Sequence, residues 1–163
     1  MKEIYARNII FGIADSLVST VGLLSGIDIS GSSHSTIVLT GMIYAFVESL
    51  SMAVGSFLSE QASEEVARKE ETHTTAPLMG GVTMFISFLL CSFIPLTPYL
   101  FLQSFSLALA LSIGLSLLTL FIVGLIMARI SKIPLIRHAA KMVLLGGMTI
   151  IVGVIIGKYV HVK

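Results

Sequence analysis

The sequence predicts an all-α membrane protein in which residues 1–163 form one transmembrane domain of five helices. Hydrophobic residues make up 55% of the chain and charged residues only 12%. A soluble domain needs about a quarter of its residues charged to cover its surface. The charged residues are clustered, and the five apolar segments among them are long enough to cross a bilayer, which takes about 20 residues.

The five predicted spans are separated by turn-forming or charged sequence. A Gly/Ser turn at residues 28–34 follows the first span, and Pro134 separates the last two. Pro95 and Pro98 are expected to break the helix after the third span, because proline lacks the backbone N–H that continues a helix. The longer connection, residues 59–76, is predicted as an acidic cytosolic loop. The spans are residues 9–27, 35–58, 77–93, 105–128 and 142–158.

The lysine and arginine residues predict the orientation, because the cytosolic loops of membrane proteins carry an excess of them. With five spans, eight of the ten fall on one side, and only Lys158 and Lys163 fall on the other. We therefore expect the N-terminus in the cytosol and the C-terminus outside it. Four or six spans would scatter these charges over both sides. The eight residues are Lys2, Arg7, Arg68, Lys69, Arg129, Lys132, Arg137 and Lys141.

Several classes of function leave no signature in the sequence. Cys91 is the single cysteine and lies in an apolar run, so the chain has no internal disulfide and no Cys-x-x-Cys motif. It has neither a phosphate-binding glycine loop nor a basic patch with interleaved aromatic residues. We expect a protein that is not an enzyme, has no resident cofactor, binds no nucleic acid and is surrounded by lipid.

Two acidic residues, Asp15 and Glu48, fall inside the first two predicted spans. Acids in hydrocarbon are unfavourable and usually face a cavity or a partner. Helical spacing places Asp15 on one stripe with Ser19, Gly22 and Gly26, and Glu48 on a similar stripe. The two stripes predict a narrow polar path between packed helices. The alternative is that each acid is neutral, hydrogen-bonded and structural. The second stripe comprises Gly41, Ala45, Glu48, Met52, Gly55 and Ser59.

Pairs of glycines four residues apart occur in the first and last spans. They are Gly22 with Gly26, and Gly153 with Gly157. Such pairs let helix backbones approach closely, although they also occur by chance in glycine-rich membrane helices. A contact between two copies of the chain is one interpretation of each pair.

Met52 and the acidic loop extend the predicted path toward the cytosol. The helical rise of about 1.5 Å per residue places Met52 at the depth of Asp15. A carboxylate with a thioether suits ferrous iron better than calcium or magnesium, although a membrane methionine more often only packs. Glu60 and Glu64, at i and i+4, repel each other unless a cation lies between them. We interpret them as a weak metal-collecting site; a solvated helical face is the alternative. The loop also holds Glu65, Glu70, Glu71 and His73.

Four segments together resemble the vacuolar iron transporter family. Residues 10–23 (IFGIADSLVSTVGL) resemble its first-helix signature, and residues 51–59 (SMAVGSFLS) resemble its second. Residues 94–99 (IPLTPY) and 145–147 (LGG) match motifs of its later helices. The similarity covers nearly the whole chain in the correct order.

The resemblance implies a homodimer of five-helix protomers that moves ferrous iron, sometimes manganese, out of the cytosol in exchange for protons. The path would run between the two first helices, lined by Asp15 and Met52. This chain departs from the family pattern at Ser56, where the family has glutamate, and at Ala14 and Ser16, which replace the Asn and Gly flanking the aspartate. The missing glutamate bears on metal handover at the cytosolic mouth.

Three functions remain as hypotheses. The leading one is a secondary transporter that exports ferrous iron or a related divalent metal, such as manganese, from the cytosol. The second is a non-transporting structural or accessory membrane subunit in which Asp15 and Glu48 are packing groups. The third is a proton-coupled carrier of small organic cations. The short loops and small size favour a prokaryotic plasma membrane as the location.

Overall fold

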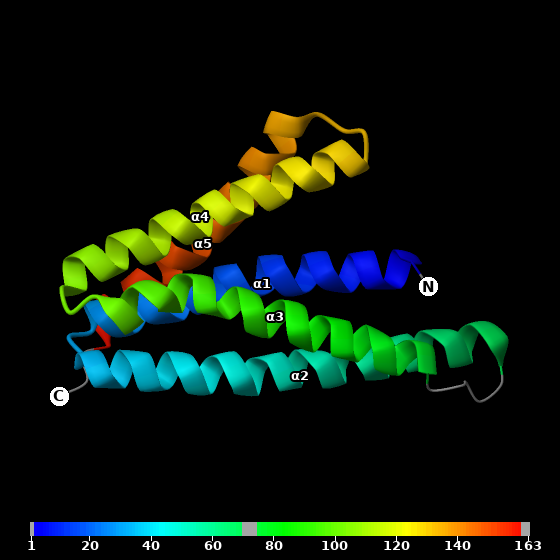
Figure 1. Ribbon diagram of the computed structural model, residues 1–163, viewed down its shortest axis with the longest axis horizontal. Coiled ribbons are helices and arrows are strands. Elements are labelled where there is room, and N and C mark those ends of the chain that lie inside the picture. Colours follow the sequence, from blue (N-terminus) through cyan, green and yellow to red (C-terminus); the bar gives the residue numbers. More distant parts are fainter. Residues whose placement is uncertain (1, 70–74, 161–163) are drawn as a thin grey trace.

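The computed structural model confirms an all-α fold of five helices, each long and apolar enough to cross a membrane. It describes residues 2–69 and 75–160, and no strand occurs within them. The N- and C-terminal ends lie at opposite ends of the bundle, as an odd number of spans requires (Figure 1). The helices are α1 (Lys2–Ile29), α2 (His34–Arg68), α3 (Thr75–Phe101), α4 (Phe105–Ile130) and α5 (Leu135–Tyr159).

The turn between α1 and α2 forms where the Gly/Ser sequence predicted it. Gly31 has a φ of 82°, in the left-handed region that glycine enters without steric cost. The hydroxyl of Ser33 then caps α2 by accepting a hydrogen bond from the Thr36 backbone N–H at 3.2 Å. The predicted break at Pro134 is also confirmed, because α4 ends at Ile130 and α5 begins at Leu135.

The break predicted at Pro95 and Pro98 is wrong, because both prolines lie inside α3. Both are buried, and the hydroxyl of Ser112 on α4 donates to the Pro95 carbonyl oxygen at 2.7 Å. Within a membrane bundle, neighbouring helices and Ser or Thr side chains compensate for the hydrogen bonds that proline removes. The helix therefore continues to Phe101.

Much of the segment predicted as an acidic loop is helical. α2 continues through residues 59–68, which are rich in alanine and glutamate, both good helix formers. Lys69 then ends the helix in a left-handed conformation, with a φ of 56°. The acids of residues 59–68 are consequently held on a rigid extension of α2, not on an irregular loop.

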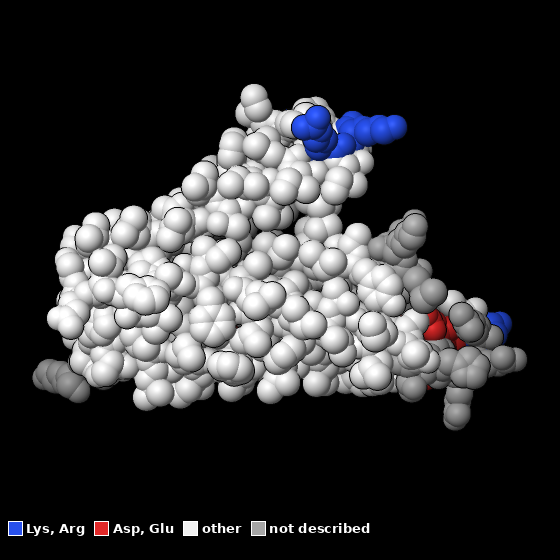
Figure 2. Space-filling view, in the orientation of Figure 1, with Lys and Arg blue, Asp and Glu red and all other residues white. Residues whose placement is uncertain are grey.

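The charged residues mark one end of the bundle. The described Lys and Arg residues other than Lys158 lie at or near the end where α1, α3 and α5 begin. This end is called the Lys/Arg-rich end below. The face drawn in Figure 2 has no Lys, Arg, Asp or Glu along the body of the bundle. Many large apolar side chains point outward, as expected beside lipid; Leu39, Leu90 and Leu144 are each more than 60% exposed.

The two glycine pairs pack against each other inside the chain. A Cβ added to Gly153 would collide with the Gly22 carbonyl oxygen, and one added to Gly157 would collide with that of Gly26. A Cβ on Gly26 would lie 2.8 Å from the Gly153 carbonyl oxygen. The pairs therefore bring α1 and α5 into backbone contact, and a contact between two copies is not needed to explain them.

A hydrophobic core cluster lies toward the end opposite the Lys/Arg-rich end. Its fully buried side chains come from α1, α2, α3 and α4. There, the hydroxyl of the buried Tyr99 donates to Asp28 Oδ2 at 2.9 Å and fastens α3 to the last turns of α1. The core residues are Leu24, Ile37, Leu96, Tyr99 and Ala108.

Candidate functional site

Asp15 of α1 and Glu48 of α2 lie near each other. Their carboxyl groups are half-buried and lie within electrostatic range of each other. The Tyr44 hydroxyl, one turn from Glu48, lies beside the Ser19 side chain and within range of both carboxyls. The structure thus brings together the two acids that the sequence singled out. Asp15, Ser19, Tyr44 and Glu48 are called the acid layer below.

The two acids of this layer have no hydrogen-bonding or ionic partner among the described residues. Ser19 bonds to the backbone carbonyl of Asp15, at 2.6 Å, and leaves its carboxyl group free. Asp28, on the same helix, differs because its carboxyl accepts the Tyr99 hydroxyl. The acid layer is therefore available to an ion or a proton in a way that Asp28 is not.

An open cavity of about 390 Å³ lies between the acid layer and the Lys/Arg-rich end. Met52 contributes to its wall, one helical turn from Glu48, as the spacing predicted. Gly55 also lines it, and no atom lies within 4 Å of where its Cβ would be. α1 packs chiefly on α3 and α5 and only lightly on α2, which leaves room for the cavity. Its lining residues are Arg7, Asn8, Phe11, Met52, Gly55, Ser56, Ser59 and Met84.

Glu60 and Glu64 do not form a free acidic pair. The carboxylate of Glu60 is bound to the guanidinium of Arg7 on α1, and its side chain is only 7% exposed. Glu64, one turn further, is half-buried, and Glu65 accepts a hydrogen bond from Gln61 Nε2 at 2.9 Å. Glu60 thus has a cationic partner, Arg7, within the chain. Glu70, Glu71 and His73 lie outside the described residues.

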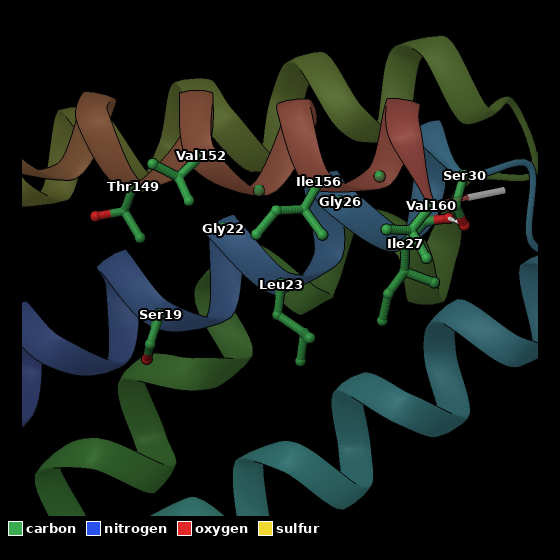
Figure 3. A pocket seen from close by; sticks show the side chains of 12 residues that line it. Ser19, Gly22, Leu23, Gly26, Ile27, Ser30, Thr149, Val152, Ile156 and Val160 are labelled. Atoms are coloured by element: carbon green, nitrogen blue, oxygen red, sulfur yellow. Dashed lines mark hydrogen bonds between the residues drawn. The ribbon is translucent and has the colours of Figure 1, made fainter. Parts of the chain in front are cut away.

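A second open space, a groove of about 370 Å³, lies on the other side of the acid layer. It follows the contact of α1 and α5, where the glycine pairs meet, and its walls are almost entirely apolar. Figure 3 shows Leu23 and Ile27 of α1 on one wall and Val152 and Ile156 of α5 on the other. Ser19 belongs both to the acid layer and to this groove, so the cavity, the layer and the groove follow one another along α1.

Several residues of the site were missed in the sequence. Tyr44 is four residues before Glu48, so its place on the same helical face was predictable from periodicity. Arg7 and Met84 were not predictable in this way, because they come from other helices and meet α2 only through tertiary packing. Within residues 2–69 and 75–160, no three His, Cys, Asp or Glu side chains gather closely enough to bind one metal ion.

Five helices, each long and apolar enough to cross a membrane, define an integral, multi-pass membrane protein, and the acid layer lies between two of them. The model of the VIT family matches residues 6–78 and 64–158, which together span nearly the whole chain. The chain belongs to the VIT family.

Three proteins are similar to this chain over most of its length. Vacuolar iron transporter homolog 1 of Arabidopsis thaliana is 26% identical over 153 residues, which cover 88% of this chain and 76% of that protein. Vacuolar iron transporter homolog 3 of the same plant is 27% identical over the same shares. An uncharacterised protein of Methanocaldococcus jannaschii is 28% identical over 156 residues, or 84% of this chain and 80% of that one. The resemblance found in the sequence is thereby confirmed.

Proposed function

We propose that the protein is a secondary transporter that moves ferrous iron, and to a lesser degree manganese, out of the cytosol in exchange for protons. The plant relatives are called vacuolar iron transporter homologs, which supports a metal ion as cargo. The Lys/Arg bias supports a cytosolic N-terminus and a C-terminus on the other side. With this orientation the cavity lies toward the cytosol and the apolar groove toward the far side.

The observation that carries the proposal is the unpartnered pair of Asp15 and Glu48. A structural acid in a membrane protein is expected to have a hydrogen-bonding partner, as Asp28 has in Tyr99. Two carboxylates that face each other repel, and either a divalent cation or a proton relieves the repulsion. Metal and protons therefore compete for the same oxygens, and entry of a metal ion releases protons. This competition is the physical basis for exchange.

The proposal includes a homodimer with the path at its centre. Asp15 and Glu48 are only half-buried within one chain, and an exposed carboxyl group beside hydrocarbon is unfavourable. A second copy would cover the acid layer and double its ligands. The sulfur of Met52, one helical turn from Glu48, would then favour iron over magnesium or calcium. Glu64, with Glu60 when Arg7 releases it, would collect ions at the entrance. We place this dimer in a prokaryotic plasma membrane.

The experiment that tests the proposal measures metal uptake by liposomes that contain the purified protein. With an imposed pH gradient, we expect saturable uptake of Fe²⁺ that protein-free liposomes lack, together with proton movement in the opposite direction. Absence of uptake by folded protein would contradict transport and favour the accessory-subunit hypothesis. Proton-coupled uptake of a small organic cation without metal uptake would favour the third hypothesis.

A further inference from the structure

On the basis of the proposed function, we propose that Met84 joins Met52 in a second metal site, inside the cavity at the Lys/Arg-rich end. This site would bind a thiophilic transition metal ion through two thioethers before the ion reaches Asp15. Met84 comes from α3 and Met52 from α2, and both line the same cavity of about 390 Å³. The cavity could hold an ion with several waters, each of which takes about 30 Å³.

Met84 lines the cavity, and its sulfur packs against α1. Met84 is only 1% exposed, and its Sδ lies 3.2 Å from where a Cβ on Gly12 would be. Because Gly12 has no side chain, this sulfur lies directly against the backbone of α1. It is therefore held between α1 and α3, while Met52 lines the cavity from α2.

Neutral oxygen donors line the same cavity. The Asn8 side chain is 3% exposed, and its Nδ2 donates to the Gly80 carbonyl oxygen at 3.1 Å. The amide oxygen of Asn8, Oδ1, then remains to accept a hydrogen bond or to bind a cation. The Ser56 hydroxyl oxygen is shielded from solvent and has no hydrogen-bonding partner among the described residues. A buried hydroxyl without a partner is unfavourable, so a bound ion or its water would stabilise it.

The electrostatics of the cavity favour passage over tight binding. None of its lining residues is acidic, and the charge of Arg7 is balanced by its ion pair with Glu60. Thioethers and neutral oxygens bind ferrous iron weakly and offer little to magnesium or calcium, which prefer charged oxygen ligands. An ion in a transport path must bind strongly enough to enter and weakly enough to leave. The site would therefore select the metal before the acid layer holds it.

The test uses Cu⁺ as a probe, because it binds thioethers strongly and its sulfur ligands can be counted by X-ray absorption. The full-length protein carries Cys91→Ala, which removes the only thiol. We expect Met84→Leu to weaken Cu⁺ binding at least about tenfold, as loss of a ligand should cost no less than loss of a supporting contact. The variant should also lose one sulfur neighbour per copper. The matched control is Met79→Leu on the same helix, at a position that is 47% exposed.

Unchanged Cu⁺ affinity and sulfur count in Met84→Leu would overturn the site, and so would an equal loss in Met79→Leu. Binding is measured without transport, so this failure is distinguishable from failure of the proposed function. In that case Fe²⁺ uptake that depends on Asp15 would persist, while the cavity would contain no metal site. In liposomes, the site predicts that Met84→Leu raises the half-saturation concentration for Fe²⁺ at least threefold more than that for Mn²⁺.

Discussion

The two halves of α1 and α2 differ in packing although their sequences follow the same pattern of small residues. Toward the far end, Gly22 and Gly26 touch the backbone of α5, and Gly41 is closed in by Leu24 and Leu96. Toward the Lys/Arg-rich end, the same stripes continue as Asp15, Glu48 and Met52. The two acids are half-buried there, and Met52 lines the open cavity. In Figure 2 a hollow also separates the α4–α5 turn from the rest of the bundle at this end.

This difference shows that a stripe of small residues does not have one role along a whole helix. Where another helix presents glycine in return, the stripe gives close packing and a fixed core. Where no helix closes over it, the stripe borders an open cavity, and its two acids have no hydrogen-bonding partner among the described residues. The closely packed half holds the helices together, and the open half contains the candidate site.

The largest effect is expected from a test of how the two ends are oriented. Two single-cysteine variants are made in a Cys91→Ala background. Ser63→Cys lies near the Lys/Arg-rich end, and Ser32→Cys lies at the far end. An impermeant thiol reagent should label the first only from the cytosolic side and the second only from the other. Labelling of both from one side would contradict the five-span topology.

A Gly→Ala substitution should change the free energy of unfolding in opposite directions in the packed half and in the open half. In Gly153→Ala the added Cβ meets the Gly22 carbonyl oxygen, and forcing the helices apart should lower the free energy of unfolding by about 1–3 kcal/mol. In Gly55→Ala nothing lies within 4 Å of the new atom, and the better helix propensity should stabilise by up to about 1 kcal/mol. Thermal unfolding in detergent measures both. Equal destabilisation would show that the two halves are packed alike.

Met52→Leu should change selectivity without disturbing the fold, because leucine and methionine have similar volumes. The thioether is soft, so its loss should lower Fe²⁺ uptake relative to Mn²⁺ uptake roughly tenfold. Competition between the two ions in liposomes measures the ratio. A ratio equal to that of the wild type would remove Met52 from the path.

The smallest effect is expected from Glu64, at the edge of the open half. Glu64→Gln should raise the half-saturation concentration roughly twofold, in line with about 0.5 kcal/mol for one such charge pair, and leave maximal uptake unchanged. Glu60→Gln also releases Arg7 from its ion pair, so it should affect maximal uptake as well. If Glu64→Gln abolished uptake in folded protein, Glu64 would belong to the main path instead.

The helices and the acid layer were predictable from the sequence because they depend on local pattern. Length and apolarity identified five spans, and helical spacing placed Asp15 and Glu48 on facing stripes. Tyr44 could have been predicted from the same helical spacing, because it is four residues before Glu48.

The sequence-based predictions failed where contacts between helices determine the structure. Pro95 and Pro98 continue α3 in a bundle that compensates for their missing hydrogen bonds. Arg7 neutralises Glu60 although 53 residues separate them along the chain. The residue spacing within one helix does not show which other helix it packs against, so neither contact could be predicted from it.

The most direct test of the account compares the same substitution at the free acid and at the partnered acid of α1. Uptake of Fe²⁺ and Mn²⁺ is measured in liposomes for Asp15→Asn and Asp28→Asn, with folding and oligomeric state checked for each. We expect Asp15→Asn to reduce uptake of both ions to the level of protein-free liposomes without changing the oligomeric state. Asp28→Asn should weaken its hydrogen bond with Tyr99, at a cost of about 1 kcal/mol, and retain transport. Near-normal iron uptake by well-folded Asp15→Asn protein would contradict the account.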